Sequence, residues 1–171
     1  MTPSEPPARQ PFLYVVVSAA GAADGIGTLI GAAREAGWDV GVIATPTAAD
    51  GFFDLAAVEA QTGHPVRAAS RKPGTPRPFP SADAVVVAPA TFNTLNKWAA
   101  GIADTLAAAT LCEAFGAGVP LAAAPCVGEE LAAHPAYRDS LRRLRSMGVR
   151  FTRGPFDWES ATELLAALRT P

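Results

Sequence analysis

The sequence has few of the residues that form covalent cross-links or metal sites. It contains two cysteines and two histidines in 171 residues, and Cys112 and Cys126 lie too far apart for a CxxC redox pair. The two thiols also lack the partner residues of a zinc cluster. We therefore expect no bound metal. Because a chain of this length can bury a core without disulfides, we also expect a protein of a reducing, cytoplasmic compartment.

Charge is also sparse, and the start of the chain has no long apolar run. Charged side chains make up 18% of the residues and the formal net charge is -2, so the chain lacks the basic surplus of a nucleic-acid-binding domain. Residues 1–11 contain four prolines and no apolar run, and we expect neither a signal peptide nor a membrane anchor there. We interpret residues 1–11 as a flexible lead-in to a single domain over residues 12–171, without nucleic-acid or membrane partners.

What the sequence does contain is an alternation of apolar strands and amphipathic helices. Its hydrophobic content is 49%, and continuous apolar runs predict strands that are buried on both faces. Runs with apolar residues at helical spacing predict the helices between them. The strands are expected over residues 12–17, 38–44, 84–88, 119–124 and 149–152. The helices are expected over residues 28–36, 52–62, 91–115 with a break at Gly101, 135–147 and 160–168.

This order of elements predicts an α/β fold. Parallel strands joined by right-handed helical crossovers form a three-layer, Rossmann-like or flavodoxin-like domain with helices on both faces of the sheet. Ligands bind such sheets at the carboxyl ends of the strands. Residues 70–80 include four prolines and three basic residues, so they predict a mobile or extended basic loop rather than a helix or a central strand.

The glycine-rich loop after the first strand does not match a dinucleotide site. Gly25 and Gly27 lie in this loop, but the GxGxxG spacing requires glycine or alanine where Ile30 stands. At the end of the second strand, where a dinucleotide site needs an acidic residue to bind the ribose hydroxyls, the sequence has Ala44, Thr45 and Pro46. Ser18 and Thr45 can donate to a mononucleotide phosphate near a helix N-terminus, or they can cap the helices that follow. These residues alone leave both interpretations open.

A more specific pattern begins at Pro89, which we expect to end its strand. The sequence of residues 89–106 is PATFNTLNKWAAGIADTL. It resembles the flavin-binding signature of the homo-oligomeric flavin-containing cysteine decarboxylase family, which includes phosphopantothenoylcysteine decarboxylases and the peptidyl-cysteine decarboxylases of lantibiotic synthesis. In that family a strand ends in a Pro-Ala-Ser/Thr-x-Asn-Thr turn, and a Gly-Ile-Ala-Asp segment follows about one helix later. The resemblance covers most of residues 12–151.

The resemblance implies an FMN-binding flavodoxin-like domain, assembled as a homotrimer or higher homo-oligomer, that acts on a small-molecule or peptide thiol. Short polar side chains and free amides of the turn would bind the polar edge of the flavin. Phe53 or Phe92 is expected to stack on the ring, whereas Trp98 fits helix packing or a subunit contact. The expected cofactor-binding residues are Ser18, Ala19, Ala20, Thr45, Phe53, Ala90, Thr91, Phe92, Asn93 and Thr94.

The sequence departs from the family pattern at two catalytic positions. Thr75 stands where the decarboxylases carry a histidine, and Gly128 stands where they carry the asparagine of a Pro-x-Met-Asn-x-x-Met-Trp segment. The glycine-rich clamp with a reactive cysteine of the phosphopantothenoylcysteine decarboxylases is absent too, which disfavours a role in coenzyme A biosynthesis. His64 and His134 each precede a proline, and we interpret them as turn or surface residues.

Cys126 and four basic residues are the remaining candidates. Cys126 lies between a predicted strand and a helix start, where the pKa of a thiol can be lowered, but a free cysteine is also a common small buried residue. The basic side chains can bind an acidic substrate at the mouth of the site or form a solvated surface. They are Arg67, Arg71, Lys72 and Arg77.

Three functions remain open from the sequence. An active enzyme would oxidise the side chain of a cysteine-containing substrate so that its carboxylate leaves. A catalytically degenerate protein would keep the flavin fold as a binding or regulatory subunit. A flavin prenyltransferase-like enzyme has a similar turn, although Asn93 and the segment 101–104 fit the decarboxylases better.

Overall fold

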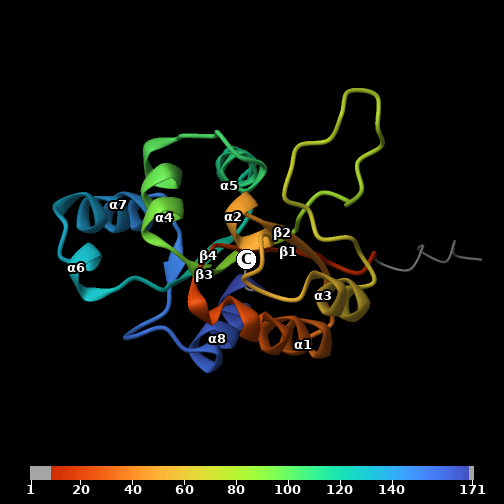
Figure 1. Cartoon of the computed structure of the whole chain (residues 1–171), viewed down its shortest axis with the longest axis horizontal. Helices are drawn as coiled ribbons and strands as arrows, with labels where there is room; N and C mark the ends of the chain where they lie inside the picture. The colour runs from red at the N-terminus through yellow and green to blue at the C-terminus, as the bar shows by residue number, and fades with distance from the viewer. Residues whose placement is uncertain (1–8, 170–171) are drawn as a thin grey trace, which may run out of the picture.

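The computed structural model describes residues 9–169, which form a five-stranded parallel sheet between two layers of helices (Figure 1). The strands are β1 (Phe12–Val17), β2 (Asp39–Ala44), β3 (Ala84–Ala90), β4 (Leu121–Pro125) and β5 (Arg150–Phe151). Their order in the sheet is β2-β1-β3-β4-β5. The predicted three-layer α/β fold is therefore confirmed.

The two helical layers each cover one face of the sheet. The first layer contains α1 (Gly27–Glu35), α3 (Leu55–Thr62) and α8 (Trp158–Leu168). The second contains α4 (Phe92–Ala100), α5 (Leu106–Gly116) and α7 (Pro135–Ser146). Short helical turns lie at η1 (Gly21–Ile26), α2 (Pro46–Ala49) and α6 (Glu129–Ala132). None of the helices within residues 9–169 is long and apolar enough to cross a membrane.

Strand β3 shows how an apolar run specifies a central strand. All seven of its residues are buried, and successive side chains of a strand point to opposite faces. Val86 packs in the core beneath α1 and α8, whereas Val85 and Val87 pack in the core beneath α4 and α5. The same second core holds Trp98, which is 1% exposed, so this side chain serves helix packing within the chain.

Pro89 does not end its strand, contrary to the prediction. β3 continues to Ala90, and its register against β4 shifts between Val87 and Ala90. Proline lacks the N–H of a ladder hydrogen bond, but its carbonyl still accepts a bond from Ser18 N at 3.1 Å. The Ala90 carbonyl likewise accepts from Cys126 N at 2.8 Å. The two carbonyl groups thus keep this end of β3 joined to the segments that follow β1 and β4.

The helix expected over residues 52–62 begins later than predicted, at Leu55. The Asp54 side chain accepts a hydrogen bond from Ala57 N at 3.0 Å and caps α3. This cap leaves Phe52 and Phe53 in the preceding turn. The break expected at Gly101 is confirmed, because this residue ends α4 with a φ of 71°, a backbone conformation that favours glycine.

Two irregular segments were also predicted. Most of the expected lead-in, residues 1–8, lies outside the described residues, and its last residues contact the domain: Arg9 pairs with Asp83 at 2.9 Å and Asp39 N donates to the Pro11 carbonyl at 2.9 Å. Residues 70–80 contain neither helix nor strand, as predicted. They project from the body beside α5 (Figure 1), and the buried side chain of Phe79 anchors their end.

Candidate functional site

A cavity of about 760 Å³ lies at the carboxyl ends of β1, β2, β3 and β4. Strands β1 and β3 are neighbours in the sheet, but the chain leaves β1 toward α1 on one face and β3 toward α4 on the other. This divergence opens the crevice that binds ligands in doubly wound α/β folds. We call the cavity the strand-end pocket. Its lining residues are Ala19, Ala20, Gly21, Thr45, Pro46, Thr47, Phe52, Thr91, Phe92, Asn93, Thr94, Lys97, Thr105, Ala108, Cys126, Val127, Gly128 and Leu131.

The N-terminus of α4 supplies hydrogen-bond donors to this pocket. Thr91 is the N-cap residue, but its side chain forms no capping bond, and the first bond of the helix runs from Leu95 N to the Thr91 carbonyl. The backbone N–H groups of residues 92–94 therefore have no partner within the helix, and the helix dipole adds positive potential there. The exposed carboxamide of Asn93 forms no hydrogen bond with another described residue. These groups can bind the acceptor atoms of a ligand.

Hydroxyl groups fix the ends of the strands behind these donors. Ser18 is buried and donates to Thr94 Oγ1 over 2.9 Å, while Thr91 donates to the same oxygen over 3.3 Å. The Thr45 hydroxyl accepts from Ala48 N at 3.2 Å and so caps α2. The capping interpretation thus holds for Thr45, which also borders the pocket, whereas Ser18 joins β1 to α4.

The structure brings most of the expected cofactor-binding residues together. The pocket is bordered by seven of them, which are Ala19, Ala20, Thr45, Thr91, Phe92, Asn93 and Thr94. Ser18 and Ala90 are buried behind it. Phe53 lies elsewhere, since the turn before α3 directs it into the core, where it is 8% exposed, and leaves its neighbour Phe52 on the pocket.

Lys97 is a lining residue that the sequence reasoning missed. It lies one helical turn after Asn93, on the same face of α4, so the helical spacing could have revealed it. Its ammonium group pairs with Asp104 Oδ2 at 2.7 Å, and this hydrogen bond lowers the pKa of the Asp104 carboxyl. Lys97 thus brings a positive charge to a lining that carries no carboxylate among the described residues.

The thiol of Cys126 also borders the pocket, but its environment differs from the predicted one. Burial raises the pKa of this thiol, whereas the position before a helix suggested that the pKa would be lowered. The physical reason is that α6 spans a single turn, which gives little dipole, while burial disfavours the thiolate. The Cys126 side chain is therefore a neutral thiol near neutral pH.

Neither histidine lines the strand-end pocket, in line with their interpretation as turn residues, although the ring of His134 packs against the lining residue Phe92. His64 Nε2 lies 2.9 Å from Asp39 Oδ1, and its ring packs against Phe79. His134 Nδ1 accepts from Ala136 N at 3.1 Å and caps α7. The four basic residues of the sequence analysis do not border the strand-end pocket, contrary to the expectation that they bind an acidic substrate at its mouth. Arg67, Arg71, Lys72 and Arg77 line a separate cavity.

The lining fits a flavin. Small side chains at Ala19, Ala20 and Ala108 leave room for a flat ring, and Phe92 and Leu131 add apolar surface. The α4 amides and Asn93 can donate to the ring carbonyls and nitrogens, which are acceptors. The volume of the pocket lies within the range of small-molecule sites.

Comparisons with known proteins show the family of the chain. The flavoprotein family model matches residues 2–167. The chain belongs to the flavoprotein family. Among curated relatives of this flavoprotein, the coenzyme A biosynthesis bifunctional protein CoaBC of Mycolicibacterium smegmatis is 36% identical over 126 residues, which are 71% of this chain and 30% of CoaBC. CoaBC of Thermococcus kodakarensis is 37% identical over 76 residues, 44% of this chain and 19% of that protein. The chain thus spans less than a third of the length of these relatives.

Solved structures share the fold of this flavoprotein. The FMN-dependent cysteine decarboxylase TvaF from thioviridamide biosynthesis has a TM-score of 0.78 at 24% identity, covering 93% of this chain and 98% of TvaF. A PPC decarboxylase mutant complexed with pantothenoylaminoethenethiol has a TM-score of 0.72 at 21% identity, covering 94% and 97% of the two chains. The FMN-binding protein AtHal3 has a TM-score of 0.68 at 24% identity, covering 84% and 80%.

Proposed function

We propose that this flavoprotein binds FMN in the strand-end pocket and decarboxylates a cysteine-containing substrate, either a peptide or a small molecule. The observation that carries the proposal is the pocket lining, in which the free amides of α4 and the Asn93 carboxamide face a space bordered by small apolar side chains. The resemblance to TvaF, an FMN-dependent cysteine decarboxylase, supports the choice of cofactor and of substrate class.

The residues of the pocket would have distinct roles. The α4 amides and Asn93 would hold the polar edge of the cofactor, and Lys97 would balance negative charge on a bound ligand. The apolar rim of Phe52 and Leu131 would exclude water. The neutral Cys126 thiol can donate a weak hydrogen bond but holds its proton. When bound, FMN would accept the two electrons removed from the cysteine side chain of the substrate, and the α-carboxylate of that cysteine would leave as carbon dioxide.

The first experiment is a visible absorption spectrum of the purified protein, followed by mass analysis of any chromophore released by acid. A yellow protein that releases FMN supports the proposal, whereas a folded, colourless protein that takes up no added FMN contradicts it. Asn93→Asp should weaken FMN binding by about tenfold or more, because it places a negative charge where an amide donor is needed. Asn93→Ala, which removes the amide without adding charge, should weaken it less.

A catalytically degenerate flavin-binding subunit is the second candidate. It is favoured by Gly128, which borders the pocket without a side chain, and by Thr75, which lies in the segment 70–80 away from it. The titratable side chains of the lining are Lys97 and Cys126 among the described residues. Anaerobic incubation of the FMN-loaded protein with peptides that end in cysteine and with small cysteine derivatives separates the two. Flavin bleaching with release of carbon dioxide supports the enzyme, and an unchanged spectrum with every thiol supports the subunit.

A prenyl-transfer activity is tested in the same preparation. Incubation of reduced FMN-loaded protein with dimethylallyl phosphate, followed by mass analysis of the flavin, would show a mass increase if the protein acted like a flavin prenyltransferase. We expect an unchanged flavin mass, because Asn93 and the segment 101–104 fit the decarboxylases better.

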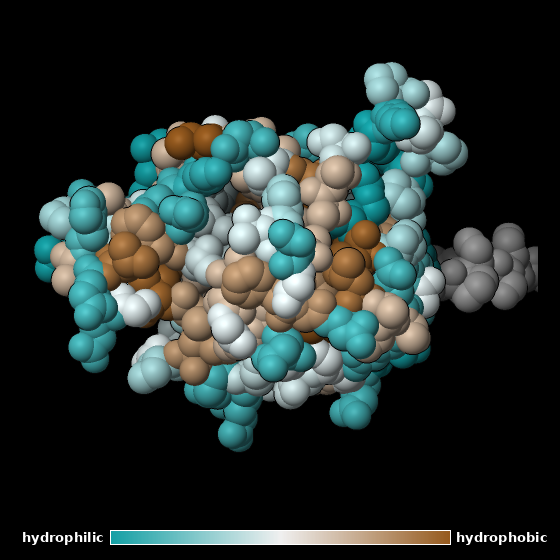
Figure 2. Space-filling view, viewed as in Figure 1, coloured by the Kyte–Doolittle hydropathy of each residue, from teal (hydrophilic) through white to brown (hydrophobic). Residues whose placement is uncertain are grey.

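We further propose that the protein assembles as a homotrimer or higher homo-oligomer. Phe52 and Leu131 are 37% and 50% exposed at the rim of the pocket, and Figure 2 shows apolar surface over α4, α6 and α7. Exposed apolar surface of this kind is typical of interfaces. Sedimentation analysis tests the assembly, and Leu131→Glu should lower the oligomer mass, while a monomeric parent protein contradicts the proposal.

A further inference from the structure

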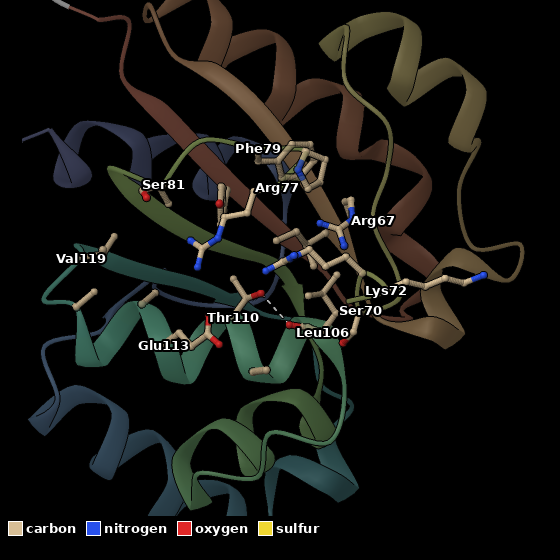
Figure 3. A pocket seen from close by; sticks show the side chains of 18 of the residues that line it. Arg67, Ser70, Lys72, Arg77, Phe79, Ser81, Leu106, Thr110, Glu113 and Val119 are labelled. Atoms are coloured by element: carbon tan, nitrogen blue, oxygen red, sulfur yellow. Dashed lines mark hydrogen bonds between the residues drawn. The ribbon is translucent and has the colours of Figure 1, made fainter. Parts of the chain in front are cut away.

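A second cavity of about 620 Å³ lies on the far side of α5 from the strand-end pocket. Ala108 of this helix and its N-cap residue Thr105 border the strand-end pocket, whereas Thr110 and Glu113 border the second cavity (Figure 3). Side chains of the segment 67–82 form the opposite side. The two cavities share no lining residue. We call this second space the basic cavity.

The lining of the basic cavity carries a net positive charge, whereas the whole chain carries a net negative one. It holds four of the 14 basic side chains but one of the 16 acidic ones, Glu113, in a chain with a formal net charge of -2. Within residues 9–169, the ion pairs leave all four of these cations without a carboxylate partner. The potential in the cavity is therefore positive, and it attracts an anion.

The basic side chains differ in how they are used. Arg77 extends toward α5 and faces Glu113 across the cavity (Figure 3), without a hydrogen bond or ion pair to another described residue. The half-buried Arg67 donates one hydrogen bond to the Ala69 carbonyl at 3.1 Å and keeps other N–H groups. Arg71 holds the Thr75 carbonyl at 2.7 Å, and the Lys72 side chain points away from α5. Arg77 forms no bond to a described residue and Arg67 is the half-buried member of the four, so we take these two cations as the ones that a ligand would contact.

Apolar and hydroxyl groups form the floor between these cations and α5. Ile43 and Phe79 are buried there at 3% and 5% exposure. The Tyr14 hydroxyl donates to the Pro80 carbonyl over 2.6 Å and so fixes the end of the basic loop at residues 70–80. Burial raises the pKa of Tyr14 while Arg77 and Arg67 act to lower it, so both positive charges act on this floor. The cavity therefore combines an apolar base with cations at its side.

We propose that the basic cavity binds a small phosphate monoester with an apolar body, and that Arg67 and Arg77 hold its phosphate. A guanidinium group presents paired N–H donors that match phosphate oxygens. The apolar floor accommodates the uncharged part of such a ligand. This site does not depend on the proposed flavin chemistry, because none of its residues borders the strand-end pocket.

Isothermal titration of the full chain with phenyl phosphate tests the site. We expect saturable binding of one phenyl phosphate per chain that weakens as sodium chloride is added, because salt screens the attraction. Arg67→Gln and Arg77→Gln should each weaken binding by about tenfold, the loss expected for a charged hydrogen bond. Glu113→Gln should tighten it by about twofold, since it removes a competing partner of Arg77.

Two matched variants control for the general loss of positive charge. Arg138→Gln on α7 and Arg153→Gln after β5 each remove an exposed cation that lines neither cavity. Both should leave the affinity for phenyl phosphate within about twofold. Equal losses in all four variants, or no saturable binding by the folded parent protein, overturn the proposal.

A competition experiment separates this site from a flavin site. Phenyl phosphate should bind protein saturated with FMN as well as it binds protein without FMN, and Arg77→Gln should leave FMN affinity unchanged. Displacement of phenyl phosphate by FMN to the same extent in the parent protein and in Arg77→Gln would place phenyl phosphate in the strand-end pocket and overturn the proposal. If the protein takes up no FMN at all, binding of phenyl phosphate with the predicted pattern of variants still supports the basic cavity.

Discussion

The Ser18 hydroxyl donates a 2.9 Å hydrogen bond to Thr94 Oγ1 across 76 positions of sequence. Ser18 directly follows β1, and Thr94 lies in the first turn of α4. Both side chains are buried, at 1% and 7% exposure. This bond therefore holds the helix that presents free amides to the strand-end pocket against the end of the neighbouring strand.

Loss of this bond should destabilise the fold. Ser18→Ala removes the donor and leaves Thr94 Oγ1 with Thr91 as its hydrogen-bonding neighbour at 3.3 Å. We expect the free energy of unfolding to fall by about 1 to 2 kcal/mol, as for a buried hydrogen bond. Urea unfolding measures this change. Ser146→Ala, which removes an exposed hydroxyl bond on α7, is the control, and an equal small effect of both variants would refute this role of Ser18.

A second prediction concerns close packing in η1. A Cβ at Gly25 would overlap the indole ring of Trp158, whose Nε1 donates to the Ala22 carbonyl at 3.0 Å. Gly25→Ala should therefore lower the free energy of unfolding by about 1 to 3 kcal/mol through overpacking. It should also change the fluorescence of Trp158. Gly21→Ala in the same turn, where a Cβ meets no atom within 4 Å, should be much milder, and equal stability of the two variants would contradict the argument.

The sheet and its order could be predicted because single segments carry the necessary information. A run such as that of β3 is apolar at every position, and only a strand with both faces covered can bury it. The turn at residues 91–94 could be predicted too, because its polar residues follow this apolar run directly in the sequence. The extension of β3 through Pro89 could not, because it depends on hydrogen bonds from Ser18 and Cys126, which are distant in sequence.

The features of the two cavities that could not be predicted from the sequence also depend on tertiary contacts. Phe52 and Phe53 are adjacent and equally apolar, so the Asp54 cap and the geometry of the turn decide which of them reaches the pocket. The basic cavity requires Arg77 to face Glu113 from another part of the chain. Sequence patterns predict neither of these tertiary contacts.

The Cys126 thiol should react slowly with alkylating reagents near neutral pH. Burial raises the pKa of this thiol, and only the thiolate is an effective nucleophile. The rate of iodoacetamide labelling, followed by mass spectrometry in a Cys112→Ser background, should lie below that of the same protein in urea. The rate should climb as the pH is raised above the ordinary pKa of about 8.5. Labelling of the folded protein as fast as the unfolded one at about pH 7 would show that the thiol is activated.

The cap of α8 should make stability depend on pH. The Asp157 carboxylate accepts from Ser160 N at 2.7 Å and from Ser160 Oγ at 2.8 Å, and these bonds lower the pKa of Asp157. Because the pKa is lower in the folded state, the stabilisation is present above the unfolded pKa and is lost as the pH falls through the folded one.

Asp157→Ala should therefore lower the melting temperature at about pH 7, and its deficit relative to the parent protein should shrink toward about pH 2. Asp157→Asn keeps an acceptor oxygen without a titrating group, so its melting temperature should exceed that of the alanine variant throughout. Thermal unfolding followed by circular dichroism across this range measures all three proteins. A parent-to-alanine difference that stays constant at every pH would show that the charge of Asp157 contributes nothing to the cap.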